Sequence, residues 1–370
     1  MCAIQISYFT LKIIQRKAKM KIRKFEMIKI ILAIFLVFSA TLLYAADKKS
    51  LVTMYPPPWK DMGGNLRELI TKEDDWVKTR EKIDVIGYWG WLFDVYFNDE
   101  EQKAFFQKLN QWNKKFSLEI PVVKGYPWGG TNPPLNGTTA FEFYLNQDKK
   151  MKKNGLKQVD YFVFDEPIYA SMYAIPHQIA NEGLVLEEFP TDVNQRIPYG
   201  AKETAKMIKS LRKLYPEAKI GDVEPYPVIK LDELKKAFDE INSECEKIGT
   251  KGLDFMRVDV DWSSLLTGQY KGSWMEMKEF ASYVSSKNVD FSMIYWASDK
   301  PLLNSKGIDY PMLWYVSIMN QGNAIRAIDL IPDEYVIESW LHMDNNMTPE
   351  SDMTTYTRSV LDFCEHIIKQ

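Results

Sequence analysis

Two adjacent carboxylates stand where a predicted strand must end. Residues 159–164 form a mostly apolar, aromatic and β-branched run, which is typical of a buried strand. Asp165, Glu166 and Pro167 follow at once, and the strand stops there because proline cannot donate to a sheet ladder. Paired carboxylates in different environments separate their pKa values, so one can hold a proton near neutral pH while the other stays charged. The alternative is that one of the two only caps a helix that begins at Pro167.

The rest of the chain repeats a strand followed by a connecting stretch, usually with a helical pattern. This alternation predicts a parallel sheet, and eight such units predict a single (β/α)8 TIM barrel. An open doubly wound sheet would place a glycine-rich turn after its first strand, where this chain has Pro56-Pro57-Pro58-Trp59. The expected strands are residues 51–55, 83–88, 118–123, 159–164, 219–223, 253–260, 290–294 and 335–337.

Most connecting stretches have a helical pattern. Residues 168–199, directly after the carboxylate pair, are the exception and are expected to be irregular. The last helix is expected to open at Thr348-Pro349-Glu350, where threonine can cap the helix and proline can occupy its first turn. The other expected helices are residues 65–81, 99–115, 140–153, 201–215, 231–248, 274–286 and 309–327.

Acidic and aromatic residues collect at the predicted strand ends. All strand C-termini of a parallel barrel meet on one face, where active sites are built. Aromatic faces stack on sugar C–H surfaces and carboxylates bind hydroxyl groups, so these residues favour a neutral carbohydrate over an anion as ligand. The candidate catalytic residues are Glu166, Asp165, Glu338, Glu224 and Asp261. The candidate substrate-binding residues are Trp89, Trp91, Trp128, Tyr226, Asp259, Trp262, Tyr295, Trp296 and Trp340.

Each of these residues also has a purely structural interpretation. A tryptophan near a strand end can pack in the core or at the rim. Glu224 precedes Pro225, so it can cap a helix as Glu166 can. Asp259 alternates with Asp261, and one of them can be a buried structural acid. The functional interpretation rests on all the strand ends taken together.

Glycosidic bond cleavage would use such carboxylates directly. The reaction needs a proton donor for the leaving oxygen and a second group that stabilises the oxocarbenium-like centre. Glu166 fits the proton donor, because Pro167 and aromatic strand residues flank it and an apolar surround raises a carboxyl pKa. The sequence therefore predicts a glycoside hydrolase with Glu166 as general acid/base and Asp165 as the orienting or stabilising carboxylate.

The Asp165-Glu166-Pro167 motif resembles the fourth-strand ends of two groups of (β/α)8 glycoside hydrolases. Retaining β-glycosidases end this strand in Asn-Glu-Pro and carry a nucleophilic Glu on strand seven. Here Asp165 replaces the Asn, and the seventh strand ends in Tyr295-Trp296-Ala297-Ser298. The N-acetylhexosaminidases carry an Asp-Glu pair on strand four, and this resemblance is the closer one. It implies attack by the acetamido group of the substrate, Asp165 as its orienting group, Glu166 as acid/base, and Tyr295 and Trp340 in the same subsite.

Two alternatives remain open at this point. In the first, a two-carboxylate hydrolase pairs Glu166 with Glu338, Glu224 or Asp261, and the carboxyl separation decides between retention and inversion. In the second, the barrel binds carbohydrate without cleaving it, because a fold does not define a function.

The N-terminal residues have the order of a secretion signal. Basic residues between Lys17 and Lys29 precede an apolar run over 30–44, which is followed by Ala45-Ala46. We expect residues 1–45 to be a signal peptide, with a true start at Met20 or Met27, and residues 46–370 to be one catalytic-type domain. This predicts a secreted or periplasmic protein without stable membrane insertion after cleavage; an uncleaved anchor is the alternative.

Composition narrows the partners further. The net charge is −3 at pH 7, and the basic N-terminal stretch makes the remainder more acidic, so nucleic acid is a poor partner. The three histidines, His177, His342 and His366, lack metal-ligand spacing, and we expect neither a metal nor a cofactor. Cys245 and Cys364 could form one disulfide.

Overall fold

A computed structural model describes residues 49–58, 63–124, 136–181, 186, 188–297, 312–338 and 346–368. The predicted signal peptide, residues 1–45, lies outside this part of the chain. Contacts group Ser50–Gln370 into one compact unit. Among the described residues, no helix combines the length and the hydropathy that crossing a membrane requires.

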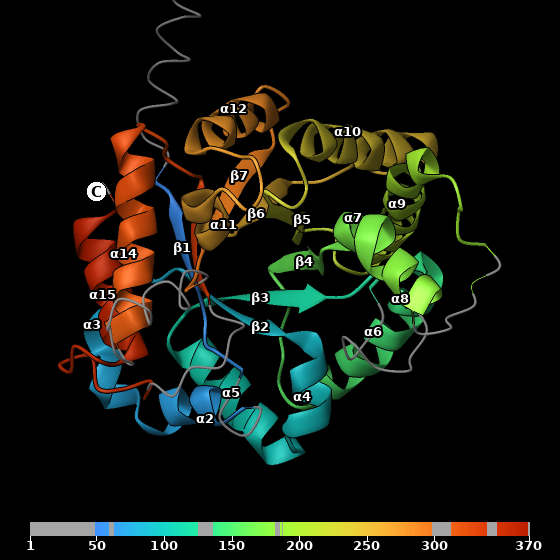
Figure 1. Cartoon of the computed structure of the whole chain (residues 1–370). Coiled ribbons are helices and arrows are strands. Elements are labelled where there is room, and N and C mark those ends of the chain that lie inside the picture. The colour runs from blue at the N-terminus through green and yellow to red at the C-terminus, as the bar shows by residue number, and fades with distance from the viewer. Residues whose placement is uncertain are drawn as a thin grey trace, which may run out of the picture. The chain divides into compact units, whose positions relative to one another are not determined.

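Eight parallel strands close into a barrel in sequence order, which confirms the predicted (β/α)8 architecture. Pairing of β1 with β8 closes the ring, with Thr53 opposite Val336 and Tyr55 opposite Glu338. Helices surround the strands as an outer layer (Figure 1). The strands are β1 (Leu51–Tyr55), β2 (Val85–Trp89), β3 (Lys115–Ile120), β4 (Tyr161–Asp165), β5 (Lys219–Tyr226), β6 (Phe255–Val260), β7 (Asp290–Tyr295) and β8 (Glu334–Glu338).

Only β1 has the predicted bounds; five strands differ from theirs by at most two residues, and β3 and β5 differ by three. β3 was expected at 118–123, but it begins at Lys115 and ends before Pro121, which has no N–H to continue the ladder. Val122 and Val123 are buried without belonging to the strand, so hydrophobicity alone misplaced it. β5 continues to Tyr226, three residues beyond the predicted end, and includes Pro225.

The helices follow the predicted order, with three local differences. The expected helix over 65–81 is broken into α2 (Gly64–Thr71), a 3₁₀ turn (Glu73–Trp76) and α3 (Val77–Lys82). The stretch after β4 is helical where it was expected to be irregular, through α7 (Pro167–Tyr169), a π-helical turn (Ala170–Ala174) and α8 (Ile175–Asn181). The last helix, α15 (Tyr356–His366), begins after Thr355, whose side chain accepts from Arg358 N, and not at Thr348.

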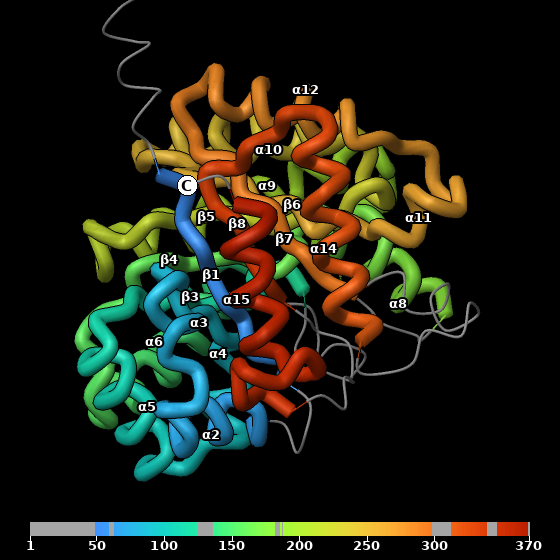
Figure 2. Tube along the Cα trace, turned by 90° about the vertical axis from the view of Figure 1, so that its left-hand side faces the viewer, coloured from blue at the N-terminus to red at the C-terminus, as the bar shows by residue number. Residues whose placement is uncertain are grey.

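Of the remaining helices, α4 (Gly90–Tyr96) and α11 (Trp262–Thr267) were not predicted, and the others lie close to their predicted positions. Helices α14 and α15 run beside each other over β7, β8 and β1 (Figure 2). Cys245 of α10 and Cys364 of α15 are both buried and do not form the possible disulfide. The other helices are α4 (Gly90–Tyr96), α5 (Asp99–Gln111), α6 (Gly137–Lys153), α9 (Arg196–Leu214), α10 (Leu231–Lys247), α11 (Trp262–Thr267), α12 (Trp274–Ser285) and α14 (Met312–Ala327).

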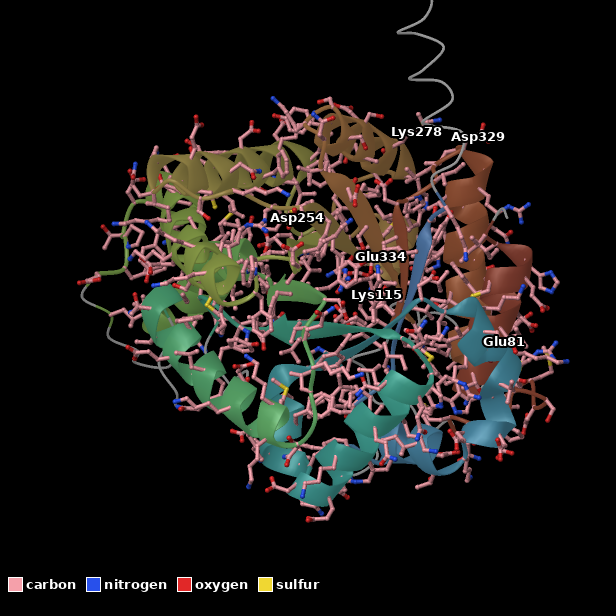
Figure 3. All side chains as sticks on the ribbon, turned by 180° about the vertical axis from the view of Figure 1, so that it is seen from behind. Glu81, Lys115, Asp254, Lys278, Asp329 and Glu334 are labelled. Atoms are coloured by element: carbon pink, nitrogen blue, oxygen red, sulfur yellow. The ribbon has the colours of Figure 1, made fainter. Side chains whose placement is uncertain are left out.

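Alternate residues of each strand face two different cores. The outer core, between strands and helices, is apolar: Phe116 of β3, for example, packs against Phe93, Phe105 and Phe106. The inside of the barrel is polar around the Arg257 guanidinium, whose Nη2 lies 3.0 Å from Glu334 Oε2. Glu334 lies within the ring of strands in Figure 3. This alternation decides which acids at the strand ends point into the barrel.

The packing of aromatic rings inside the barrel requires glycine at two positions. A Cβ on Gly87 would lie 2.0 Å from the Tyr55 ring, and one on Gly221 would lie 2.2 Å from the Phe255 ring. Tyr55 and Phe255 are buried, and the Arg257 guanidinium lies over both rings. Packed side chains therefore occupy the barrel below the level of its C-terminal strand ends.

Candidate active site

Asp165 and Glu166 end β4 on either side of one ammonium group. Lys124, which follows β3, places its Nζ 2.8 Å from Asp165 Oδ1 and 2.9 Å from Glu166 Oε2. Lys124 is buried, and its pKa is raised despite that burial because both carboxylates favour the charged form. The pair predicted from sequence is thus the anionic half of a buried ion-pair triad.

The backbone holds Glu166 in an unusual conformation. Its φ and ψ are 49° and 48°, in the left-handed region that residues other than glycine seldom occupy. Glu166 N donates to Val223 O of β5 at 3.1 Å, and its carbonyl accepts from Ala170 N at 2.9 Å. The next residue, Pro167, begins α7. Glu166 thus occupies the N-cap position of α7, but its side chain makes no capping hydrogen bond and presents its carboxylate to Lys124 instead.

Glu338 is the last residue of β8 and faces the inside of the barrel, in phase with Glu334. Its side chain is 3% exposed, and its Oε2 has no hydrogen-bond partner among the described residues. Burial raises the pKa of Glu338 to about 8; Arg257 opposes this shift, and the charges of Asp165 and Glu166 add to it. Glu338 is therefore protonated at neutral pH.

Asp259 and Glu119 complete the group of acids at this level. Asp259, on β6, has an unpartnered Oδ1 among the described residues, and its pKa is raised well above its usual range by burial and by Glu166 and Glu338. Glu119, on β3, has its pKa raised likewise by burial, Glu338 and Asp165. These side chains are close enough to interact electrostatically. We call Glu119, Asp165, Glu166, Asp259 and Glu338 the acid cluster.

Sequence reasoning missed Glu119. The misplaced third strand put this residue near the start of a strand, far from its end. The alternation of Ser117 and Glu119 with buried Phe116, Leu118 and Ile120 was the available signal, because it marks one polar face of a strand.

Glu224 faces away from the acid cluster. Its Oε1 accepts from Ile168 N at 2.7 Å and its Oε2 from Tyr169 N at 2.9 Å. These are backbone donors in the first turn of α7, which has no side-chain cap of its own. Glu224 thus fixes the segment that follows Glu166. Asp222, which shares this outer face of β5, has both oxygens buried without a partner among the described residues.

Three other candidates at the ends of β5 and β6 have local partners. Asp261 caps α11 and accepts from Ser264 N at 3.1 Å. Tyr226 donates its hydroxyl to the Glu276 carboxylate and accepts from Ser273 N at 2.6 Å. Trp262 packs against Trp274 with ring centroids 5.3 Å apart. The structure does not bring these three residues into the acid cluster.

The candidate aromatics divide into inner and outer residues. Trp89 faces the barrel interior and packs edge-on against Tyr55, and the Trp296 side chain lies against Asp259. Tyr295 faces outward, where it stacks with Tyr335 and contacts Phe363 of α15, so it does not lie with the acids. Trp91 packs against Tyr96 on α4. Trp128 and Trp340 lie outside the described residues.

Two further features lie away from the strand ends. A pocket of about 470 Å³ near the start of β3 is lined by Lys114, Lys115 and Lys157; Lys115 is labelled in Figure 3. The N-terminal side of a barrel usually serves stability. Within the described residues, the one group of three His, Cys or acidic side chains close enough to share a metal ion is Asp362, Glu365 and His366 on α15. Asp362 there is paired with Arg358.

Comparison with known proteins identifies a fold class and no family. No protein-family model and no curated protein matches the chain. Its structural neighbours are TIM barrels that include glycoside hydrolases but also an aldolase and a reductase, all at low identity.

Three neighbours illustrate this range. The PgaB (BpsB) glycoside hydrolase domain from Bordetella bronchiseptica is 10% identical, with 79% of this chain and 94% of that chain covered and a TM-score of 0.43. A psychrophilic family 10 endo-β-1,4-xylanase is 12% identical, with 86% and 98% covered and a TM-score of 0.46. The aldose reductase from Schistosoma japonicum is 12% identical, with 85% and 82% covered and a TM-score of 0.39.

Proposed function

We propose that this chain is a secreted or periplasmic glycoside hydrolase that uses Glu338 and Glu166 as its two working carboxylates. The main support for this proposal is that the two carboxyl groups lie in different environments. Glu166 contacts the Lys124 ammonium at 2.9 Å, whereas Glu338 has a buried, unpartnered oxygen and a pKa of about 8. Two carboxyl groups in unlike environments are what acid-catalysed glycosidic cleavage requires.

The roles follow from these environments. Glu338 donates its proton to the departing glycosidic oxygen, because it is the protonated member at neutral pH. Burial raises the pKa of Glu166 as well, and Asp165 adds to this shift, but the Lys124 ammonium opposes it. We therefore assign Glu166 the charged role, in which it stabilises the oxocarbenium-like centre as nucleophile or as base for water. This reverses the role that the sequence suggested for Glu166. Asp165 holds Lys124 in place from the other side of the ammonium group.

The geometry favours this scheme over attack by a substrate acetamido group. That route requires a tyrosine beside the Asp-Glu pair, and the resemblance assigned this role to Tyr295. The Tyr295 ring packs instead between the strands and α15. Of the three possible partners for Glu166, Glu224 and Asp261 bind backbone N–H groups at helix starts, and only Glu338 faces the acid cluster.

Trp89 and Trp296 supply the sugar-binding character of the site. Both indoles belong to the inner face at the level of the acids, and both are largely buried. Aromatic faces next to carboxylates suit a carbohydrate ring, which presents C–H surfaces and hydroxyl groups together.

The test compares Glu338→Gln and Glu166→Gln on aryl glycosides with good and poor leaving groups, with Glu100→Gln on the exposed face of α5 as the matched control. Loss of a general acid should cost on the order of 10²–10⁴-fold with a poor leaving group and far less with a good one. Loss of Glu166 should slow both substrates. If Glu166→Gln instead shows the large loss with the poor leaving group only, and Glu338→Gln slows both substrates, then Glu166 is the general acid/base. Glycan binding without cleavage by the wild-type protein would identify a carbohydrate-binding barrel.

A further inference from the structure

The acid cluster contains more negative groups than its cations can neutralise. Lys124 bridges Asp165 and Glu166, and Arg257 is paired with Glu334 deeper in the barrel. Glu119, Asp259 and Glu338 have no ion-pair partner among the described residues. A buried site of this composition either retains protons or accepts a positively charged ligand.

Asp259 marks where such a ligand would bind. Its side chain is 8% exposed and points into the barrel, and its Oδ1 has no hydrogen-bond partner in the described part of the chain. Buried polar atoms are nearly always satisfied, so an orphaned carboxylate oxygen in a site calls for an absent donor. The indole N–H of Trp296 lies on the same carboxylate and favours its charged form.

The triad on β4 shows which kind of cation these acids accept. The Lys124 ammonium fits between Asp165 and Glu166 at ordinary hydrogen-bond distances. A metal ion fits less well: no three residues of the acid cluster bring ligand oxygens close enough together to share one ion. The geometry thus favours a protonated amine, which needs one unpartnered carboxylate oxygen and not a set of three ligands.

We propose that Asp259 and Trp296 form a binding site for the protonated amino group of an amino sugar, which makes the substrate a glycan with free amines. This inference rests on the proposed function, and it narrows the neutral sugar that the sequence suggested to a cationic one. In the free protein, burial raises the pKa of the Asp259 carboxyl. A bound ammonium group lowers that pKa, so binding shifts the carboxyl toward its charged form, and the protons that are displaced pass to solvent.

Calorimetric titration with glucosamine, N-acetylglucosamine and glucose tests this without assuming a glycosidic linkage. We expect the wild-type protein to bind glucosamine at least about tenfold more tightly than the other two sugars. Repeating the titration in buffers of different ionisation enthalpy should show net proton release for glucosamine at pH 7. The two neutral sugars should release none.

Asp259→Asn is the decisive variant, with Asp74→Asn at an exposed position of the 3₁₀ turn as its control. The first should abolish both the preference for glucosamine and the proton release. The second should preserve both effects. Thermal unfolding of each variant shows whether the barrel is intact.

The outcomes separate this inference from the proposed function. If the wild-type protein cleaves glycans but binds glucosamine no better than glucose, the amine site is refuted and the hydrolase survives. If it prefers glucosamine through Asp259 but cleaves no glycan, the amine site survives and the hydrolase is refuted. Absence of binding to all three sugars overturns the amine site.

Discussion

Lys124 donates to Glu166 across the ends of β3 and β4, with 2.9 Å between Nζ and Oε2. The same ammonium binds Asp165, so its removal leaves two neighbouring carboxylates without their shared cation. We expect Lys124→Met to raise the pKa of Glu166, because the loss of an adjacent positive charge disfavours the ionised form.

The measurable result for Lys124→Met is a shift in the pH–rate profile. If Glu166 works as a carboxylate, the acidic limb of kcat/KM moves to higher pH and activity at neutral pH falls by at least about tenfold. Lys153→Met is the control, because Lys153 pairs with Asp99 at the surface and is 70% exposed. An unshifted acidic limb in Lys124→Met would contradict the assigned role of Glu166.

Stability should fall as pH rises from about 5 to above 8. Glu119, Asp259 and Glu338 have pKa values raised in the folded state, so over this range the folded protein binds more protons than the unfolded chain. The stabilisation is therefore complete at low pH and is lost as pH rises through the folded-state values. Urea denaturation across this range should show a flatter profile for Glu338→Gln than for the wild-type protein. An increase in the free energy of unfolding of the wild-type protein over this pH range would contradict raised pKa values for these buried acids.

The left-handed backbone of Glu166 gives a second stability prediction. Glu166→Gly and Glu166→Ala both remove the carboxylate, but only glycine adopts the observed φ of 49° without steric cost. We expect the glycine variant to be more stable than the alanine variant by about 1 kcal/mol, and both to be inactive on unactivated glycosides. Equal stability in urea denaturation would show that the backbone relaxes.

Glu224 should affect the site only by holding the segment that follows Glu166 in place. Glu224→Gln keeps one acceptor oxygen, so one of the N–H groups of Ile168 and Tyr169 loses its partner, at a cost of about 1–3 kcal/mol. Hydrogen exchange at these two amides should accelerate. Because no proton transfer is lost, kcat should fall without a change in the pKa values of the pH–rate profile. Glu217→Gln on the exposed surface is the control, and an altered alkaline limb in Glu224→Gln would instead implicate Glu224 in chemistry.

Strand and helix order could be predicted from the sequence because the hydrophobic periods are strong. The closed ring, the fourth-strand position of Asp165 and Glu166, and most helix positions match their expectations. The errors arise where two signals compete. Val122 and Val123 look like strand residues, but Pro121 had already ended the ladder. The segment after Pro167 lacks a clear apolar period, yet Glu224 caps its first turn from another strand, which no local pattern reveals.

The sequence did not show which residues of each strand face the inside of the barrel. Both faces of a strand in a parallel barrel are buried, so alternation alone does not say which residues face inward. On β5, Gly221 and Val223 face the interior, and Glu224 therefore points toward α7. On β7, the same alternation turns Trp296 inward and Tyr295 outward. Residue types were thus sufficient to place six of the eight strand ends to within one residue, and three-dimensional packing was needed to choose among the side chains there.

The packed interior beneath the acids closes the barrel below this site. Tyr55, Phe255 and Arg257 occupy the axis of the barrel, with Gly87 and Gly221 making room for the two rings. Whatever enters must leave from the same end of the strands. A product must therefore dissociate before the next substrate molecule binds. A product that dissociates slowly competes with substrate for the site.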